Sequence, residues 1–351
     1  MLKLAIISPF PPAVGGMAVL AETLKTSLET QEIEVISINT NPIIKAGNRF
    51  ERINKILQFW FYIFNLRKVY SCDASIIISS SGDFFYAKAL PALYFCKLFK
   101  CKSILDFVGG GVLPQLENKR SRITKHLKKF DCIIVPSTPF QESFERAGIR
   151  CELLPHIVRI EKFQQNRGLG VEPVFLSAKN LQEYSNVESI IRAFALIKKQ
   201  CSNARLLITG RGPQEGYLKA LAKDLNLSDV DFLENLSNEE MPLVFGRATF
   251  FLHATRIESF GIAIVEALAS GLAVISSNVG GIPDIIKDGE NGYLIEYNDH
   301  ESMATKALFL LKNKLIYQEI VSEGVKTAQS YSAKNLSPRL IDLIERIIND
   351  K

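Results

Sequence analysis

Long apolar runs are missing from this 351-residue chain. The nearest candidate, residues 56–66 (ILQFWFYIFNL), is flanked by cations and is shorter than the roughly 20 apolar residues of a membrane-spanning helix. The chain opens directly on a strand-like segment, LKLAIIS, without the charged and apolar regions of a signal peptide. We therefore expect no transmembrane helix, no signal peptide and a cytoplasmic location.

Histidine and cysteine are too few and too scattered to suggest a metal site. The chain has 6 cysteines and 4 histidines; no two cysteines form a Cys-x-x-Cys pair, and no histidine cluster accompanies them. A zinc site or a disulfide framework requires such clustering. We therefore expect no metal and no cofactor, and we expect the cysteines to be free thiols.

Acidic residues are scarce in the first half of the chain. Residues 1–170 carry 23 Lys/Arg against 14 Asp/Glu, a net +9, whereas residues 171–351 carry 19 against 23, a net −4. A basic half favours an anionic partner, which leaves nucleic acid, a membrane surface and an acidic glycan open. The charge is concentrated in the strip Lys119–Lys129 and around Trp60. For the aromatic residues of 51–70 we expect packing in the core, with the long cationic side chains reaching solvent. The alternative is that this amphipathic cationic helix lies in an anionic membrane interface, which would make the protein peripheral on the inner membrane face.

Strands and helices alternate along the chain in two blocks. In the first block we expect strands at 2–8, 33–39, 74–79, 102–108, 131–136 and 151–155, and helices at 16–31, 51–70, 82–99, 115–129 and 139–147. A polar stretch, 162–173, has the composition of a linker. Beyond it we expect strands at 174–178, 204–209, 229–233, 249–254 and 272–276, and only helices over 300–350. Such alternation is typical of doubly wound parallel sheets. We predict an α/β protein with Rossmann-like domains at 1–162 and 174–332 and a final helix at 333–351.

The most informative segment is residues 258–271, ESFGIAIVEALASG, which reads as the turn and helix between two strands. Open parallel sheets bind ligands at the carboxyl ends of their strands. Gly261 lets the backbone approach a ligand closely, and the helix that follows directs free N–H groups toward an anion. Glu258 and Glu266, on the order of 10 Å apart on such a helix, suit hydroxyls at both ends of a ligand with phosphates between them. The segment therefore indicates a sugar nucleotide.

Together with NVGGIPDIIKDGENGYLI directly after it, this segment resembles the signature of the retaining family-four glycosyltransferases, which have the GT-B fold. The resemblance extends to residues 9–24, 177–194 and 206–218, in the family's order. It implies two Rossmann-like domains facing across a cleft, with the last helix crossing back to the first domain. It also implies transfer of a sugar from a nucleotide-diphosphate sugar, for which we expect a UDP-sugar. The acceptor would be a cell-surface polysaccharide or lipid-linked glycan precursor and not a nucleic acid.

The resemblance also implies roles for residues of the second half. Glu258 would hold hydroxyls of the donor sugar as a catalytic residue, and Glu266 would hold the ribose. Phe260, Gly261 and Ile262 would form the donor-binding turn.

Further donor contacts are expected on both halves. Gly15 and Gly16 would approach the donor phosphates, because paired glycines after a strand free backbone N–H groups. Lys179 would bind the diphosphate, and Arg211 would assist it. In this family, retention of the anomeric configuration is commonly attributed to front-face attack, in which the leaving phosphate takes the acceptor proton. We therefore expect no strong base, no Asp-x-Asp pair and no dependence on a metal ion.

The chain departs from the family's pattern at three places. Val108 stands where the family often has a histidine, just before three glycines that we expect to clear space for a substrate. Asp106, two residues earlier on the same strand face, is our candidate catalytic substitute, with a buried or capping aspartate as the alternative. The family's second cation is missing at 184–186, and His156, Ile157 and Arg159 replace another family motif. Two other functions therefore stay open: a non-catalytic module that binds a sugar nucleotide or polyanion, and a sugar-nucleotide epimerase of the same fold.

Overall fold

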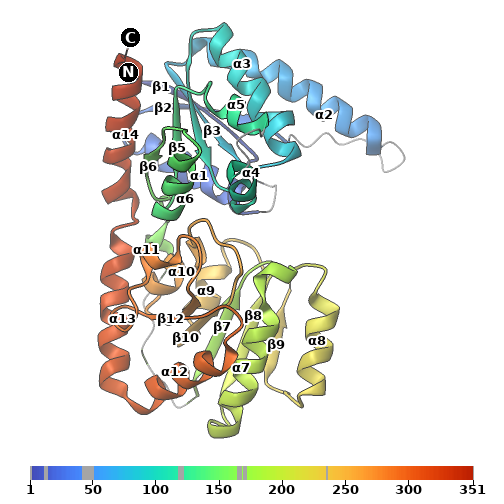
Figure 1. Cartoon of the computed structure of the whole chain (residues 1–351), viewed down its shortest axis with the longest axis vertical. Coiled ribbons are helices and arrows are strands. Elements are labelled where there is room, and N and C mark those ends of the chain that lie inside the picture. The colour runs from blue at the N-terminus through green and yellow to red at the C-terminus, as the bar shows by residue number, and fades with distance from the viewer. Residues whose placement is uncertain are drawn as a thin grey trace. The chain divides into compact units, whose positions relative to one another are not determined.

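The structure, a computed structural model, describes residues 2–11, 15–41, 51–117, 122–163, 168, 172–234 and 236–350. It divides into two units, Met1–Ile157 with Ala333–Lys351, and Val158–Ser332 (Figure 1). Residues 158–162, which we had placed in the first domain, thus lie with the second unit. There the backbone N–H of Val158 donates to the carbonyl of Tyr331 at 2.9 Å.

The first unit is built on a parallel sheet in the order β2-β1-β3-β4-β5-β6. Its strands are β1 (Lys3–Ser8), β2 (Glu34–Asn39), β3 (Ala74–Ser79), β4 (Lys102–Phe107), β5 (Cys132–Val135) and β6 (Glu152–Leu153). Its described α-helices are α1 (Gly16–Glu29), α2 (Glu51–Leu66), α3 (Leu90–Leu98), α4 (Leu113–Glu117), α5 (Arg122–Leu127), α6 (Thr138–Arg146) and α14 (Ala333–Asn349). The last helix is held to this sheet in part by Lys102, whose Nζ donates to the carbonyl of Asp350 at 2.7 Å.

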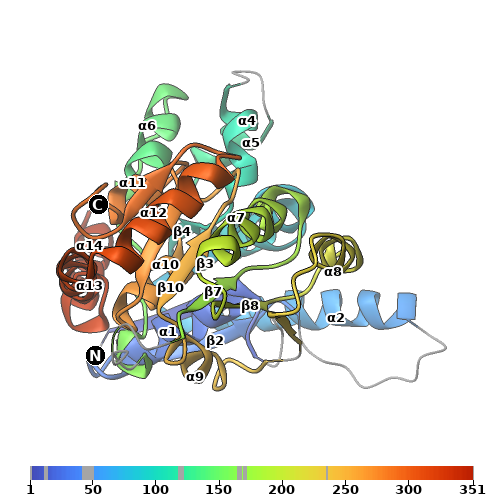
Figure 2. The same ribbon diagram turned by 90° about the horizontal axis from the view of Figure 1, so that it is seen from below.

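The second unit repeats the plan with the sheet order β12-β11-β10-β7-β8-β9, again parallel throughout. Its strands are β7 (Val174–Ala178), β8 (Arg205–Thr209), β9 (Val230–Leu233), β10 (Phe250–His253), β11 (Ala273–Ser277) and β12 (Tyr293–Ile295). Its described α-helices are α7 (Val187–Gln200), α8 (Glu215–Asp224), α9 (Met241–Phe245), α10 (Ile262–Ala269), α11 (Ile282–Ile285), α12 (His300–Lys312) and α13 (Lys314–Gln329). Helix α12 packs on α7, and α13 packs on α10 (Figure 2).

Each unit has its own apolar core, which explains why the two blocks of alternating strands and helices could be predicted from the sequence. In the second unit, Phe175 of β7 and Phe250 of β10 stack with ring centroids 4.7 Å apart, and Tyr317 of α13 donates from its hydroxyl to the carbonyl of Thr249 at 3.1 Å. Strand β12 was not expected, because three residues are too few for a periodic pattern.

The expectation for the aromatic residues of 51–70 was wrong for most of them. Tyr62 is fully buried, but Trp60, Phe61 and Phe64 are exposed. Helix α2 reaches the core along one face only, so its opposite face keeps its aromatic side chains in contact with solvent. None of the described helices is long and apolar enough to cross a bilayer.

Candidate functional site

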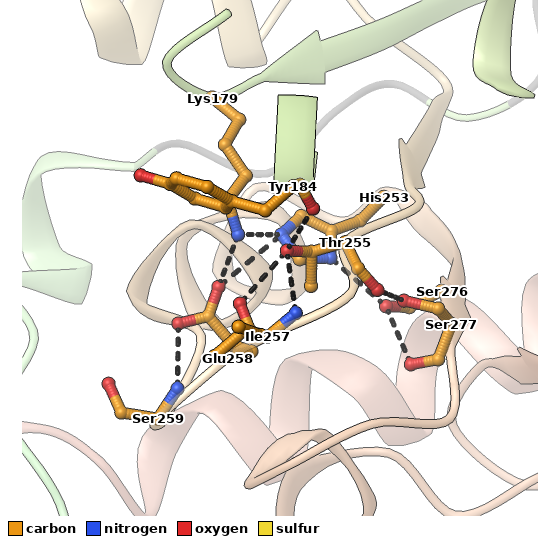
Figure 3. Close-up of polar contacts among 9 residues, drawn as sticks. All are labelled: Lys179, Tyr184, His253, Thr255, Ile257, Glu258, Ser259, Ser276 and Ser277. Atoms are coloured by element: carbon orange, nitrogen blue, oxygen red, sulfur yellow. Dashed lines mark hydrogen bonds and ion pairs between the residues drawn. The ribbon is translucent and has the colours of Figure 1, made fainter. Parts of the chain in front are cut away.

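Three ionisable side chains meet at the carboxyl edge of the second sheet. Strands β7 and β10 are neighbours, and the chain runs from β7 outward to β9 on one side and from β10 outward to β12 on the other. This pair is the topological switch point, where open parallel sheets bind ligands. Lys179 follows β7, His253 ends β10, and Glu258 lies in the loop between β10 and α10. Figure 3 shows the three side chains directed at one another; we call them the Lys179 cluster.

The Lys179 cluster is centred on a close ion pair. Lys179 Nζ donates to Glu258 Oε2 at 2.6 Å and lies 3.3 Å from His253 Nε2, which is itself 3.6 Å from the same carboxylate oxygen. The backbone N–H of Ser259 donates to the other carboxylate oxygen at 3.2 Å. The Lys179 and Glu258 side chains are only 17% and 19% exposed, so solvent screens their attraction poorly.

The geometry around His253 determines its protonation. Burial, and next the charge of Lys179, hold the pKa of His253 well below its usual range, so the ring is neutral at pH 7. An ammonium has only donors, so Nε2 of His253 must accept from Lys179 and the ring proton must sit on Nδ1. Nδ1 lies 3.2 Å from Ser276 Oγ, which can accept that proton (Figure 3). The neutral imidazole thus orients Lys179 without competing for Glu258.

Backbone contacts fix the loop that carries Glu258. The carbonyl of Tyr184 accepts from Thr255 Oγ1 at 3.2 Å and from the backbone N–H of Arg256 at 2.8 Å. Ser277 Oγ, at the end of β11, donates to the carbonyl of Thr255 at 2.8 Å (Figure 3). The loop is therefore attached to the segment that follows β7 and to the last residue of β11, on both sides of β10.

Two glycines allow the backbones of Lys179 and Glu258 to approach their neighbours. Gly210 has φ 110° and Gly280 has φ 54°, conformations that other residues adopt with strain. A Cβ atom on Gly210 would collide with the carbonyl oxygen of Lys179, and one on Gly280 with the carbonyl oxygen of Glu258. The positions of both charged residues therefore depend on the absence of a side chain opposite them.

Helix α10 begins immediately beyond this loop. Its N-cap residue is Gly261, with φ 113° and no side-chain cap, so its first N–H groups have no capping side chain. Phe260 is buried with its ring 5.4 Å from that of Tyr331, edge to face, whereas Ile262 is half-buried at the first helical position. At this turn a ligand would contact backbone N–H groups and not the Phe260 ring.

Glu266 lies on α10, half-buried. Burial raises its pKa to about 8, while the charge of Arg159 acts in the opposite direction. The carboxyl is therefore mostly protonated at pH 7 and can both donate and accept a hydrogen bond.

Arg211 is exposed at the carboxyl end of β8, and its carbonyl accepts from the backbone N–H of Leu181 at 2.9 Å. Its charge is a minor cause of the lowered pKa of Glu234, after the hydrogen bond from Lys219. Within the described ranges it makes no ion pair with the Lys179 cluster.

Gly15 and Gly16 lie at the carboxyl end of β1 in the first unit. Gly15 has φ 148°, precedes α1, and accepts at its carbonyl from the backbone N–H groups of Ala18 at 3.1 Å and Val19 at 3.2 Å. A Cβ atom on either glycine would meet open space. The residues just before them, 12–14, lie outside the described residues.

Asp106 ends up buried near the carboxyl end of β4, with its Oδ1 4.0 Å from Nδ1 of His156. That oxygen has no hydrogen-bond partner among the described residues. Burial raises the pKa of Asp106 to about 7 and lowers the pKa of His156 to about 4. At neutral pH the histidine is therefore neutral, and the carboxyl divides between its protonated and ionised forms. The departure at His156, which carried little weight in the sequence, supplies an ionisable neighbour of Asp106.

The glycines after Asp106 serve packing in a way that the sequence did not suggest. A Cβ atom on Gly109 would lie 2.9 Å from the Cβ of Ser80, and one on Gly111 would lie 2.7 Å from Ser81 Oγ. Both glycines thus make room for the loop that follows β3, and their clearing of space for a substrate stays a prediction.

The sequence does contain an Asp-x-Asp pair, Asp229-Val230-Asp231, which corrects our expectation that there is none. It lies at the amino end of edge strand β9, away from the carboxyl edge that carries the Lys179 cluster. Asp229 pairs with Lys198 and Asp231 with Arg205, each at 2.7 Å. Among the described residues no group of three His, Cys, Asp or Glu side chains could hold a metal ion.

His253 is the site residue that the sequence reasoning undervalued. We assigned it no role from the sequence, yet it is buried and hydrogen-bonded, and it contacts both charged members of the Lys179 cluster. Its position at the last residue of β10, five residues before Glu258, was the available signal.

Residues 158–327 match the family described as Glycosyl transferases group 1. One relative, N-acetyl-alpha-D-glucosaminyl L-malate synthase of Bacillus anthracis, is 30% identical over 180 residues, which is 51% of this chain and 46% of that protein. Alpha-monoglucosyldiacylglycerol synthase of Streptococcus pneumoniae is 24% identical over 94% of this chain and 82% of its own length.

The fold also has solved counterparts. The structure of Anabaena HepE in complex with UDP-glucose superposes with a TM-score of 0.76 at 17% identity, covering 99% of this chain and all of the other. This likeness confirms the predicted fold of two Rossmann-like domains with a long C-terminal helix.

Proposed function

The chain belongs to the group 1 glycosyltransferases, a retaining family with the GT-B fold, and on this premise we propose that it transfers a hexose from a UDP-sugar to a lipid-linked glycan or polysaccharide precursor. The observation that carries the proposal is the Lys179 cluster, placed at the switch point beside the N-terminus of α10. A cation, a helix N-terminus and a carboxylate together match a ligand that has both phosphates and hydroxyls.

On donor binding, Lys179 exchanges partners. In the structure its ammonium is neutralised by Glu258 at 2.6 Å. A diphosphate that reaches the N-terminus of α10 carries more negative charge than one carboxylate and takes over the ammonium. Glu258 is then released to accept hydrogen bonds from hydroxyls of the donor sugar, while His253 keeps Lys179 oriented.

Glu266 completes the donor site at the ribose. Because its pKa is raised to about 8 by burial, its carboxyl is mostly neutral at pH 7 and suits the ribose hydroxyls, which both donate and accept. Arg211 is assigned to the phosphates, and Gly261 and Ile262 offer backbone N–H groups to them; the expected contact of Gly15 and Gly16 with the donor phosphates stays a prediction.

Lys179, α10 and the glycine turns stabilise the leaving diphosphate, so that no metal ion is required. The leaving phosphate takes the proton of the acceptor hydroxyl. On the acceptor side we assign Asp106, whose Oδ1 has no hydrogen-bond partner among the described residues and whose pKa is raised to about 7.

The choice of substrates draws on the relatives. UDP-glucose is bound in the HepE structure, which supports a UDP-sugar donor. The name of the pneumococcal relative refers to a glucosylated diacylglycerol, a lipid, which supports a lipid-linked acceptor. The net +9 of residues 1–170 fits an acceptor on an anionic membrane surface, where the enzyme would act as a peripheral protein. Of the cationic strip assigned to this contact, Lys119 and Arg120 lie outside the described residues.

One experiment tests the donor site and the activity in sequence. The melting temperature is measured with a panel of sugar nucleotides, since a ligand that binds the native state raises it. The stabilising nucleotide is then used as donor in a turnover assay. Lys179→Met should abolish the stabilisation. Lys219→Met is the matched control, because Lys219 also pairs with a carboxylate at 2.6 Å, that of Glu234, but on an exposed surface. Equal stabilisation of both variants would refute the role of Lys179.

A non-catalytic module is the second candidate, favoured by the missing second cation. Tyr184 and Ser185 belong to a 3₁₀ turn, η6 (Glu183–Ser185), and with Asn186 they offer no positive charge to a diphosphate. Stabilisation by a sugar nucleotide without transfer to any acceptor would support this reading. An epimerase would instead release an altered sugar nucleotide without an acceptor.

A further inference from the structure

Helix α2 carries two apolar stripes on opposite faces. Phe59, Tyr62, Ile63 and Leu66 follow the spacing i, i+3, i+4, i+7, which lines one face of a helix. Leu57, Trp60, Phe61 and Phe64 follow the same spacing, displaced by two residues and therefore by about half a turn. A helix with two apolar faces leaves one of them in water unless each face contacts its own apolar surface.

The first stripe has found its partner in the core of its own unit. Tyr62 and Leu66 are fully buried among core residues, and Tyr62 donates from its hydroxyl to the carbonyl of Lys88 at 2.6 Å. Lys88 in turn donates from Nζ to the carbonyl of Thr40 at 2.7 Å. These contacts hold the rotation of α2 about its axis, and so determine which face remains outside.

The second stripe, which we call the outer face of α2, remains in solvent. Trp60 is 63% exposed, Phe61 52%, Phe64 56% and Leu57 46%, and Ile56 beside them is 57% exposed. Figures 1 and 2 show α2 extending past the other helices of its unit. A contiguous exposed apolar surface of this kind marks an interaction site.

The charges around the outer face indicate what it contacts. Residues 54–72 and 84–105 contain no Asp or Glu. Their exposed cations are Lys55, Arg67, Lys68, Lys97 and Lys100. The guanidinium of Arg67 lies 3.7 Å from the centre of the Phe64 ring, so a positive charge sits directly at the edge of the apolar face. Aromatic rings bordered by cations, with no acid among them, are complementary to the headgroup and upper acyl region of an anionic bilayer.

We propose that the outer face of α2 inserts into the interface of an anionic lipid bilayer and anchors the first unit there. The helix would lie in the plane of the membrane, with the rings of Trp60, Phe61 and Phe64 below the headgroups and Arg67 at their level. This deepens the proposed function, on which it rests for the lipid-linked acceptor: the anchor brings the acceptor-side unit to the surface that holds such an acceptor.

Trp60 is the single tryptophan of the chain, so its fluorescence reports on the outer face directly. The whole protein is titrated with vesicles of phosphatidylglycerol and phosphatidylcholine, and with phosphatidylcholine alone. We expect a blue shift of the emission with the anionic vesicles and quenching by lipids brominated on the upper acyl chain. Binding to the neutral vesicles should be weaker, because the cations then lack partners. Sedimentation with anionic vesicles without a blue shift would overturn insertion and leave adsorption by charge alone.

A matched pair of variants separates the outer face from general stickiness. Phe61→Ser with Phe64→Ser keeps the Trp60 probe and should lower the vesicle partition coefficient at least about tenfold. The control is Leu243→Ser with Leu315→Ser, on α9 and α13 of the second unit, where the side chains are 70% and 75% exposed. The control should bind as the wild type does, and equal loss in both pairs would overturn the proposal.

Two further measurements complete the test. Stabilisation by the sugar nucleotide should be unchanged in the Phe61/Phe64 variant, so failure of membrane binding is distinguished from failure of the donor site. Sedimentation velocity without lipid should give a monomer. A dimer that the Phe61/Phe64 variant abolishes would assign the outer face to a second copy of the chain and overturn the membrane anchor.

Discussion

Both units have ionisable side chains near the carboxyl ends of the strands of similar sheets, but the hydrogen bonding of these side chains differs between the units. In the second unit Lys179 and Glu258 are paired, His253 is satisfied, and Gly210 and Gly280 hold the backbone close. In the first unit Asp106 Oδ1 is buried without a hydrogen-bond partner among the described residues. The outer face of α2 is likewise uncovered. The ionisable groups at this edge of the second unit are thus paired with one another, whereas Asp106 of the first unit keeps one unpaired carboxyl oxygen among the described residues.

The largest effect should come from filling the space opposite Glu258. Gly280→Ala places a Cβ atom against the Glu258 carbonyl at φ 54°, so the loop must move. We expect a loss of about 3 kcal/mol in the stability of the second unit, and no stabilisation by the sugar nucleotide. Gly15→Ala is the control in the first unit, where a Cβ meets open space and only the strain of φ 148°, about 1 kcal/mol, remains. Urea unfolding measures both, and similar losses would show that close approach is not what Gly280 provides.

Next in size is the chemistry at Glu258. Glu258→Gln weakens the acceptor of the sugar hydroxyls and should lower turnover at least about tenfold. Glu266→Ala should weaken nucleotide binding as well as turnover, because we assign Glu266 to the ribose of the nucleotide. Steady-state kinetics with varied donor concentration separates the two. Wild-type turnover in Glu258→Gln would remove Glu258 from the mechanism.

Both units contain a carboxyl whose pKa is raised by burial, Asp106 to about 7 and Glu266 to about 8. The folded protein therefore holds these protons more tightly than the unfolded chain does. Their contribution to stability is complete below about pH 4 and is lost as the pH rises toward 7 for Asp106 and 8 for Glu266. Asp106→Asn and Glu266→Gln mimic the protonated form, so each should exceed the wild type in stability at pH 8 and match it near pH 4. Urea unfolding at pH 4 and pH 8 measures the stability of each variant and of the wild type. A gain in stability at pH 4 that is absent at pH 8 would contradict the prediction.

The smallest expected effect is that of chelation. With Asp229 and Asp231 each paired to a cation, and Lys179 with α10 assigned to the diphosphate, turnover should be unchanged by EDTA. Loss of activity that Mn²⁺ or Mg²⁺ restores would assign the reaction to a metal-dependent mechanism.

Much of the architecture could be predicted from the sequence, because buried parallel strands and amphipathic helices leave local patterns of apolar residues. Strands such as 74–79 and 174–178 have the predicted bounds. The three-residue strand β12 was too short to leave a pattern. Where one helix was expected over 115–129, the described residues form α4, which already begins at Leu113, and α5. The boundary of the second unit was displaced by the pairing of Val158 with Tyr331, which lie far apart in sequence.

The sequence by itself determined the two alternating blocks, the glutamates on either side of the start of α10, and the excess of cations in the first half. These follow from residue order and composition. Only the tertiary structure decided that His253 contacts Lys179 and Glu258, that His156 lies beside Asp106, and that the outer face of α2 remains in solvent. The physical reason is the same in each case. The local sequence pattern indicates which residues are apolar or charged. It does not indicate which of two equivalent apolar faces of a helix will be buried, or which strand ends will lie side by side, because these neighbours are decided only when the sheet is assembled.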